Sequence, residues 1–178
     1  MSAQVVRLRR GLRSETGAPL SRALLDQLHD LLQLDQIAGV SAVRTLFVAS
    51  DAAKARLVRH LSPGDHDLAL SAPAVAVIGF DFLFAVSLIV SASPVANPDC
   101  AVAIRTARRS ATLQGATLHL AAGAVGLEAT AIANFDAAGL RREFFGGTEA
   151  TVVALFRLAP SASLIVASAF EDLDSHIK

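Results

Sequence analysis

The chain has 178 residues, and its 16 lysines and arginines are balanced by 16 aspartates and glutamates. A chain without net charge has no general electrostatic attraction to nucleic acid, so we expect no such partner. Its one cysteine, Cys100, excludes an internal disulfide and fits a reducing compartment, which predicts a cytoplasmic protein. The length suffices for one hydrophobic core and no linker divides the chain, so we predict a single domain over residues 1–178.

Hydrophobic residues make up 53% of the chain, and the apolar segment 72–95 is long enough to raise the question of a membrane span. Pro73 opens this segment, Asp81 interrupts it and Pro94 closes it. A carboxylate inside a spanning helix costs about 2.5–3.5 kcal/mol on insertion scales. The part 74–80, AVAVIGF, is instead typical of a strand buried on both faces. We therefore predict no membrane span, and expect a dimer to cover exposed apolar surface.

In the N-terminal half, Ser21 is placed to cap a helix with leucines along one face. These leucines are Leu24, Leu25, Leu28, Leu31 and Leu32. The run 44–49, RTLFVA, predicts a strand. Ser50 and Asp51 then predict the start of a short helix that stops at Pro63-Gly64.

The C-terminal half begins with a predicted helix over 101–125, either continuous or in two parts. Gly126 supplies the left-handed position that ends it. The sequence further predicts an edge or short strand over 130–135, a helix over 138–145 and a last strand over 151–158. Helices that alternate with strands not joined as hairpins indicate an α+β or α/β class.

The segment 112–145, TLQGATLHLAAGAVGLEATAIANFDAAGLRREFF, carries the strongest pattern in the chain. Its elements LQGA, GL, FD and a helix ending in FF resemble the nitroreductase-like flavoprotein family, in particular the branch with malonic semialdehyde reductases. The resemblance implies an α+β fold with a central, mainly antiparallel sheet flanked by helices. It also implies an interlocked homodimer that binds FMN at the subunit interface.

Arg9, Arg10 and Arg13 form a basic cluster in the sequence RRGLR. Closely spaced arginines supply the charge-assisted donors that a phosphate requires. In the resembling family, an R-x-S-x-R element near the N-terminus binds the FMN phosphate and ribityl chain, so the resemblance assigns the three arginines to FMN. The alternative is a solvated basic face without a ligand.

After the leucine helix, the family carries a segment close to GPTSANSQP, whose polar side chains hydrogen-bond the flavin. The corresponding residues 35–43 read DQIAGVSAV. Ser41 keeps its residue type, and Val40 stands where the family has asparagine. The resemblance therefore assigns Ser41 to the FMN site and leaves one amide contact without a counterpart.

A second flavin-facing element of the family is a loop close to GPMxG, whose backbone N–H groups face the flavin. The resemblance places Thr130, Ala131, Ile132 and Ala133 at this loop, followed by Asn134. Backbone donors survive a change of side chain, so these residues remain candidates for FMN binding. The alternative is an ordinary crossover loop.

Residues 105–110, RTARRS, admit two interpretations, an anion patch for a nicotinamide phosphate or a solvated face of the family's dimer helix. The second is favoured, because three neighbouring arginines repel one another unless they are counter-charged. The family's C-terminal arginine, another phosphate ligand, has no match after the last strand.

Five histidines are dispersed along the chain. His119 lies in an apolar stretch, which favours a satisfied core histidine, and His29 is expected at the surface. His60 and His66 could approach each other around the Pro63-Gly64 turn, but this metal signal is weak. We predict neither a metal ligand nor a catalytic side chain, since in flavin chemistry the cofactor carries the reaction.

Two functional hypotheses follow from the resemblance. The first is an FMN-dependent NAD(P)H oxidoreductase that reduces a small electrophilic acceptor (a nitro compound, quinone or aldehyde) by ping-pong hydride transfer. The second is a flavin-free dimer of the same fold, a binding or interaction protein that has lost the site. The basic cluster favours the first, and the missing flavin contacts favour the second.

Overall fold

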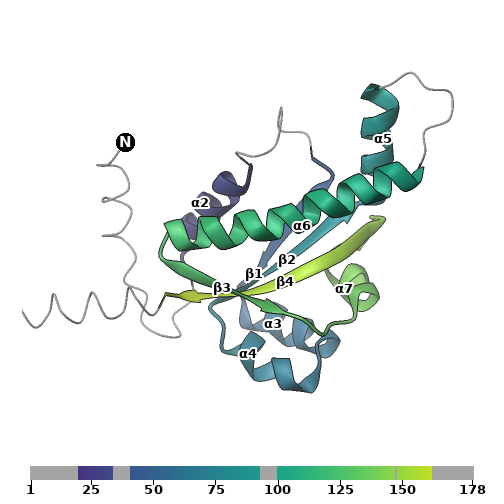
Figure 1. The fold of residues 1–178 in the computed structure, drawn as a ribbon. Coiled ribbons are helices and arrows are strands. Elements are labelled where there is room, and N and C mark those ends of the chain that lie inside the picture. The colour runs from purple at the N-terminus through teal and green to yellow at the C-terminus, as the bar shows by residue number, and fades with distance from the viewer. Residues whose placement is uncertain (1–19, 34–40, 93–99, 147, 162–178) are drawn as a thin grey trace, which may run out of the picture.

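The structure, a computed structural model, describes residues 20–33, 41–92, 100–146 and 148–161. Its centre is a four-stranded sheet in the order β1-β2-β4-β3, in which all three neighbouring pairs are antiparallel (Figure 1). The strands are β1 Val43–Val48, β2 Ala74–Asp81, β3 Leu127–Ile132 and β4 Ala150–Pro160. The predicted α+β class with an antiparallel sheet is confirmed.

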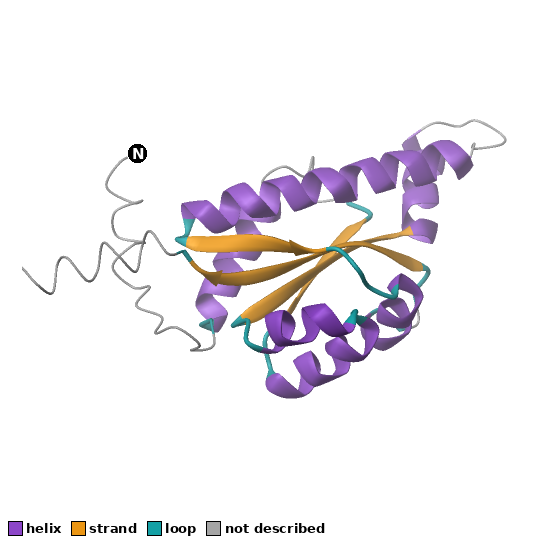
Figure 2. Cartoon of the chain, turned by 60° about the horizontal axis from the view of Figure 1, so that its bottom comes forward, coloured by secondary structure: helices purple, strands orange, loops and turns teal. Residues whose placement is uncertain are grey.

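Strand β2 lies inside the sheet and inside the molecule. All its residues from Ala74 to Phe80 are buried, and only the terminal Asp81 is partly exposed. Helices cover both faces of the sheet (Figure 2), so both sets of alternating side chains need to be apolar. Burial on both faces of the sheet therefore explains why the run AVAVIGF is apolar without interruption, and the predicted strand is confirmed.

Helices α2 (Arg22–Gln33) and α6 (Cys100–Ala124) pack on one face of the sheet. The Ser21 hydroxyl accepts a hydrogen bond from the Leu24 N–H at 3.2 Å, which confirms the predicted cap. Between the two helices, the buried Gln114 Nε2 donates to the Leu32 carbonyl at 3.1 Å. This bond satisfies a carbonyl in the last turn of α2 that has no partner within the helix.

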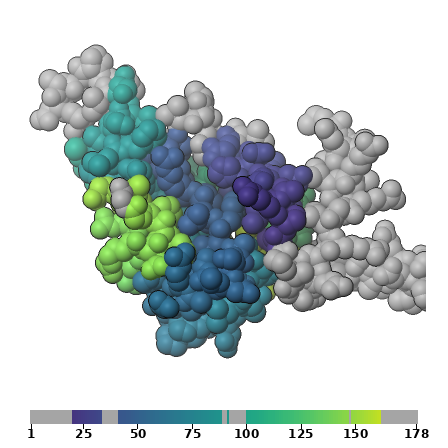
Figure 3. Space-filling view, turned by 180° about the vertical axis from the view of Figure 1, so that it is seen from behind, coloured from purple at the N-terminus to yellow at the C-terminus, as the bar shows by residue number. Residues whose placement is uncertain are grey.

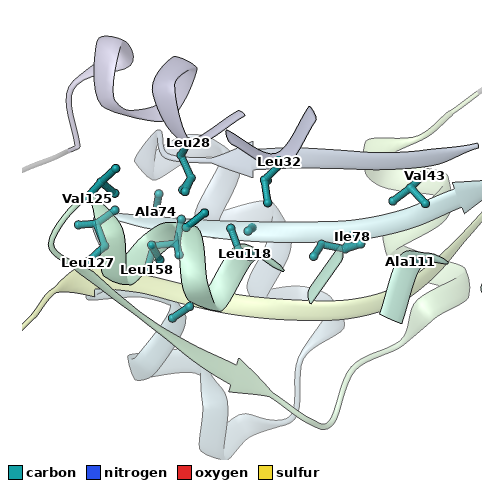
Figure 4. Close-up of a cluster of buried hydrophobic side chains, with 14 of the residues drawn as sticks. Leu28, Leu32, Val43, Ala74, Ile78, Ala111, Leu118, Val125, Leu127 and Leu158 are labelled. Carbon is teal, nitrogen blue, oxygen red and sulfur yellow. The ribbon is translucent and has the colours of Figure 1, made fainter. Parts of the chain in front are cut away.

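A close-up of this layer shows leucines from both helices directed toward the sheet (Figure 4). Leu28 and Leu32 of α2 and Leu118 of α6 are fully buried. They meet the side chains of alternate sheet residues, among them Ile78 and Leu158. The period of 3.6 residues in the helices and of two in the strands directs these side chains into one core.

Shorter helices cover the opposite face (Figure 2). They are α3 (Asp51–Leu57), α4 (His66–Leu70) and α7 (Ala137–Phe144), with 3₁₀ turns η2 (Val58–His60) and η3 (Pro63–Asp65) between the first two. Ser50 caps α3 as predicted, because its hydroxyl accepts from the Ala53 N–H. The predicted stop at Pro63-Gly64 was placed too late: α3 ends at Leu57, and Pro63 instead opens η3.

The apolar stretch after β2 forms α5 (Phe82–Ala92), whose start is fixed by the end of the sheet. An Asp81 carboxylate oxygen, Oδ1, accepts from the Phe84 N–H at 3.1 Å and so caps this helix. Asp81 is thus both the last residue of β2 and the cap of α5. Among the described residues, none of the helices combines the length and apolarity needed to cross a bilayer.

Helix α6 is continuous over 25 residues, which decides between the two forms predicted for this region. Gly126 follows it with φ of 80°, so the predicted left-handed helix end is confirmed. The chain then enters β3 at Leu127, three residues earlier than predicted, and runs at the edge of the sheet beside β4.

Candidate functional site

A cavity of about 450 Å³ opens at the end of the sheet where β2 finishes and β4 begins. Two strands, β2 and β4, and three helices, α5, α6 and α7, from distant parts of the sequence converge on it. Its lining consists of Phe80, Phe82, Ile104, Arg108, Ala137, Ala138, Arg141, Glu149, Ala150, Thr151 and Val152. Its size lies in the range of small-molecule sites, about 300–1,000 Å³.

The elements around the cavity are tied to one another by backbone hydrogen bonds. The Phe82 N–H donates to the Glu149 carbonyl at 3.1 Å, which joins the start of α5 to the start of β4. The Asp81 N–H donates to the Ala42 carbonyl at 2.8 Å and fixes the beginning of β1 at the same end. Figures 1 and 3 both place α5 and α7 together at this end of the molecule.

The cavity wall carries three charged side chains. Arg141 Nη1 lies 3.0 Å from Glu149 Oε2, so these two charges compensate each other. Arg108 is exposed, and the described residues provide no ion pair for its guanidinium. The lining therefore has one positive charge in excess.

The first turn of α7 borders the cavity and is held by Asp136. The Asp136 carboxylate accepts from the Ala138 N–H at 3.0 Å, and the Asp136 N–H donates to the His60 carbonyl at 2.7 Å. A backbone hydrogen bond from Gly139 is the main cause that lowers the pKa of the Asp136 carboxyl. Gly139 has no space for a Cβ, which would meet the His60 ring and the Asp136 carboxylate. The helix N-terminus is thus already occupied by a side chain of this chain.

The residues assigned to FMN by the resemblance are only partly visible in the structure. Arg9, Arg10 and Arg13 lie outside the described residues. Ser41 is half-buried just before β1, and its hydroxyl accepts from the Val43 N–H at 3.0 Å. Ser41 therefore lies at the cavity end of the sheet, although it does not belong to the cavity lining.

The loop predicted over Thr130 to Ala133 is wrong, because most of this segment belongs to a strand. Thr130, Ala131 and Ile132 are the last three residues of β3, where they pair with residues 157, 156 and 155 of β4; only Ala133 lies beyond the strand. Leu127 and Ala129 are buried in the core layer with α2 and α6, whereas Ile132 is buried in the opposite layer, so this edge strand packs on both core layers. Because β1 and β3 are opposite edges of the sheet, Ser41 and this segment are separated by two strands within one chain.

Among the described residues, however, the backbone N–H and C=O of Ala131 have no hydrogen-bond partner. In an antiparallel pair, successive residues direct their N–H and C=O groups alternately toward and away from the partner. The Ser161 N–H donates to the Gly126 carbonyl, whereas the Ala129 carbonyl lies 3.1 Å from His119 Nδ1, outside the ladder. Ala131 shares the orientation of Ala129, so its donor and acceptor both face the open edge. A donor beside an acceptor matches the edge of a flavin ring, and this part of the chain fits FMN.

The remaining histidines hold structural positions. His119 is an exposed residue whose Nδ1 lies 3.1 Å from the Ala129 carbonyl, which corrects the expectation of a core histidine. His29 is exposed, as predicted. His66 Nε2 lies 3.2 Å from the Leu61 carbonyl. Within the described residues, no group of three or more histidine, cysteine or acidic side chains is arranged to hold a metal ion.

Sequence reasoning missed the cavity itself. It treated Arg108 as part of a solvated arginine face, and it assigned no role to Phe82 or Arg141. One local signal was present: Ile104 and Arg108 are four residues apart and therefore share one side of α6. The other walls come from β2, α5, β4 and α7, and no spacing rule connects these elements to α6.

Comparison with known proteins identifies the family. No protein-family model matches the chain. It is 35% identical over 161 residues to a Stenotrophomonas maltophilia (strain R551-3) protein named as an NADH dehydrogenase/NAD(P)H nitroreductase, a match that covers 83% of this chain and 80% of the relative. A second protein of that species, from strain K279a and with the same type of name, is 37% identical over 141 residues, 73% of this chain and 69% of the relative.

Solved structures give the same fold. A nitroreductase from Exiguobacterium sibiricum, crystallised in complex with FMN, matches with a TM-score of 0.68 at 16% identity and covers 90% of this chain and 88% of its own. The chain thus has the nitroreductase fold. Together with the two relatives, this shows that it belongs to the NAD(P)H nitroreductase family.

Proposed function

We propose that this protein is an FMN-dependent NAD(P)H oxidoreductase that reduces a small electrophilic acceptor, such as a nitro compound, a quinone or an aldehyde. The observation that carries the proposal is the 35% identity to a relative named for NAD(P)H nitroreductase activity, over four-fifths of both chains. The proposal also includes a cytoplasmic location, where NAD(P)H is available and a single cysteine stays reduced.

Three parts of the chain are proposed to hold the cofactor. Arg9, Arg10 and Arg13 would bind the FMN phosphate through charge-assisted hydrogen bonds. The open backbone groups of Ala131 would pair with the flavin edge, and the Ser41 hydroxyl of a second copy of the chain would donate its hydrogen, because the two segments lie at opposite edges of one sheet. When bound, FMN supplies the redox chemistry, which is hydride uptake from NAD(P)H and hydride delivery to the acceptor.

The cavity at the end of the sheet is the proposed acceptor site. Its apolar side chains, Phe80, Phe82 and Ile104, would exclude water from a small organic molecule. Its charged groups would orient that molecule. The protein then contributes binding and orientation, so no side chain has to act as nucleophile or general base.

Replacing Arg10 or Arg13 by alanine is expected to reduce FMN affinity about ten- to hundredfold for each substitution, because each removes one charge-assisted contact worth about 1.5–3 kcal/mol. The measurement is the visible absorption of the purified protein, before and after incubation with excess FMN and desalting. Arg22→Ala is the matched control, since Arg22 is 94% exposed and its ion pair with Asp26 spans 3.9 Å. This control should keep the flavin content of the wild type.

Equal flavin content in wild type, Arg10→Ala and Arg13→Ala would contradict the assignment of the arginines. A wild-type protein that stays colourless after incubation with FMN would contradict the oxidoreductase proposal itself. The flavin-free binding protein, the second hypothesis from the sequence, would then be the function to pursue.

We also propose that the protein is a homodimer that uses the outer face of α6. Leu113 and Leu120 are two turns apart and are 55% and 74% exposed, on the side of the helix that faces away from the sheet. Val102, which is 41% exposed, continues the same side. Exposed apolar side chains in a row favour a protein partner over solvent, and the family resemblance implies a second copy of the chain.

Leu120→Glu is expected to convert this dimer to monomer at micromolar concentration, because it places a charge in an apolar contact. Analytical ultracentrifugation gives the mass directly. Leu70→Glu is the control, since Leu70 is 44% exposed on α4 in the opposite layer, and it should leave the mass unchanged. A wild-type monomer, or a dimeric Leu120→Glu variant, would exclude this interface.

A further inference from the structure

We propose that the cavity at the end of the sheet selects small organic anions, and that Arg108 binds their carboxylate. The proposal rests on the proposed function where it calls the ligand the acceptor of the reaction. The binding preference itself follows from the charges and the walls of the cavity. Among the possible acceptors, this preference selects molecules in which an apolar body carries a carboxylate.

The charges of the lining favour an anion. Arg141 and Glu149 are paired at 3.0 Å and cancel each other. Of the other carboxylates near this end, Asp136 accepts from the Ala138 N–H and Asp81 accepts from the Phe84 N–H, and neither belongs to the lining. Within the part of the chain that the structure describes, Arg108 is therefore the one charged side chain of the lining without a counter-charge. A guanidinium presents two parallel N–H donors that match the two oxygens of a carboxylate.

The walls favour an apolar body attached to that carboxylate. Phe80 is 2% exposed and closes the cavity at the sheet. Ile104 lies one turn before Arg108 on the same side of α6, so the cation borders the apolar wall. A carboxylate bonded to Arg108 can therefore leave the rest of its molecule against Ile104 and the two phenylalanines, Phe80 and Phe82. A low-polarity wall strengthens the attraction between the guanidinium and the carboxylate compared with bulk water.

Direct binding tests this preference without any turnover. The probes are 4-nitrobenzoate and its neutral counterpart 4-nitrobenzamide, measured by equilibrium dialysis against the purified full-length protein, in the flavin state in which it is isolated. The wild type is expected to bind the carboxylate about tenfold more tightly than the amide, and Arg108→Ala to lose that difference. Arg108→Lys should restore part of it, because it keeps the charge and loses the two-pronged geometry.

Arg105→Ala is the matched control. Arg105 is exposed on the same helix, three residues earlier, and does not line the cavity. Arg105→Ala removes the same charge as Arg108→Ala, so a general electrostatic effect would change the preference for the carboxylate equally in both variants. Far-ultraviolet circular dichroism of each variant verifies that α6 is intact, and the preference for the carboxylate is compared only among folded variants.

The proposal is overturned if the wild type binds both probes equally, or if Arg108→Ala and Arg105→Ala behave alike. Its failure can be told apart from failure of the proposed function. Steady-state reduction of both probes with NADH and NADPH supplies the second readout. Turnover without a preference for the carboxylate would reject the anion site and retain the oxidoreductase. Selective binding without turnover or bound flavin would reject the oxidoreductase and retain the anion site.

Discussion

Gly79→Ala is expected to lower the free energy of unfolding by about 3 kcal/mol, at the upper end of the usual cost of overpacking a core. Gly79 lies in the central strand β2, where the pairing with β4 shifts register between Ile78 and Gly79. A Cβ at this position would stand 2.7 Å from the carbonyl oxygen of Thr151 and 3.5 Å from the Cα of Val152. These are backbone atoms of the neighbouring strand, so no side-chain rotation relieves the contact.

The measurement is urea unfolding followed by circular dichroism. Gly123→Ala is the matched control, because a Cβ there meets nothing within 4 Å. Gly123 lies in the last turn of α6, where alanine is favoured over glycine by about 0.5–1 kcal/mol. The control should therefore be as stable as the wild type or more so. A Gly79→Ala protein of wild-type stability would show that the two strands separate easily at the register shift.

Lys54→Met is expected to lower the free energy of unfolding by about 2–4 kcal/mol, because buried carbonyls lose their donor. The Lys54 side chain is 8% exposed, and its ammonium donates to the carbonyls of Leu70 and Ala72 at 3.1 and 3.0 Å. It thereby ties α3 to the connection between α4 and β2. Methionine keeps the length and apolar stem of lysine, so the loss of stability can be attributed to the missing ammonium and not to a cavity.

Asp51→Asn separates this effect from the neighbouring ion pair. Asp51 Oδ1 lies 3.0 Å from the Lys54 ammonium, but its side chain is 100% exposed. An ion pair with a fully exposed carboxylate contributes little, and in Asp51→Asn the Lys54 ammonium keeps its bonds to the Leu70 and Ala72 carbonyls, so the control should change the midpoint of thermal unfolding little. If Lys54→Met and Asp51→Asn had equal effects, the ion pair and not the carbonyl bonds would explain the role of Lys54.

Most of the fold could be predicted from local patterns. The leucine spacing after Ser21, the AVAVIGF run and the long segment before Gly126 each had one dominant periodicity, and each formed the expected element. The segment after Asp81 could not be assigned, because it is apolar without a period that distinguishes helix from strand. Its helical form follows the end of β2, where Asp81 caps the new helix through the Phe84 N–H.

The site could be predicted less well. The resemblance led to FMN and to Arg9, Arg10 and Arg13, which lie outside the described residues and remain a prediction. It also led to a loop at Thr130 that proved to be a strand. The local pattern had predicted an edge or short strand over 130–135, so here the pattern was right about the strand and the family resemblance was wrong about the loop; the bounds 127–132 follow from pairing with β4, whose residues lie about 25 positions away.

By itself, the sequence determined the class of the fold and the family, because periodicity and short ordered motifs are properties of neighbouring residues. It also determined that charge would be balanced and that a left-handed Gly126 would follow the end of α6. Only the tertiary structure decided which arginine of α6 faces a cavity. Arg105 and Arg108 have the same chemistry and the same helix, and they differ only in what β4 and α7 bring beside them. That difference depends on how distant segments pack against each other, and no local pattern in the chain specifies it.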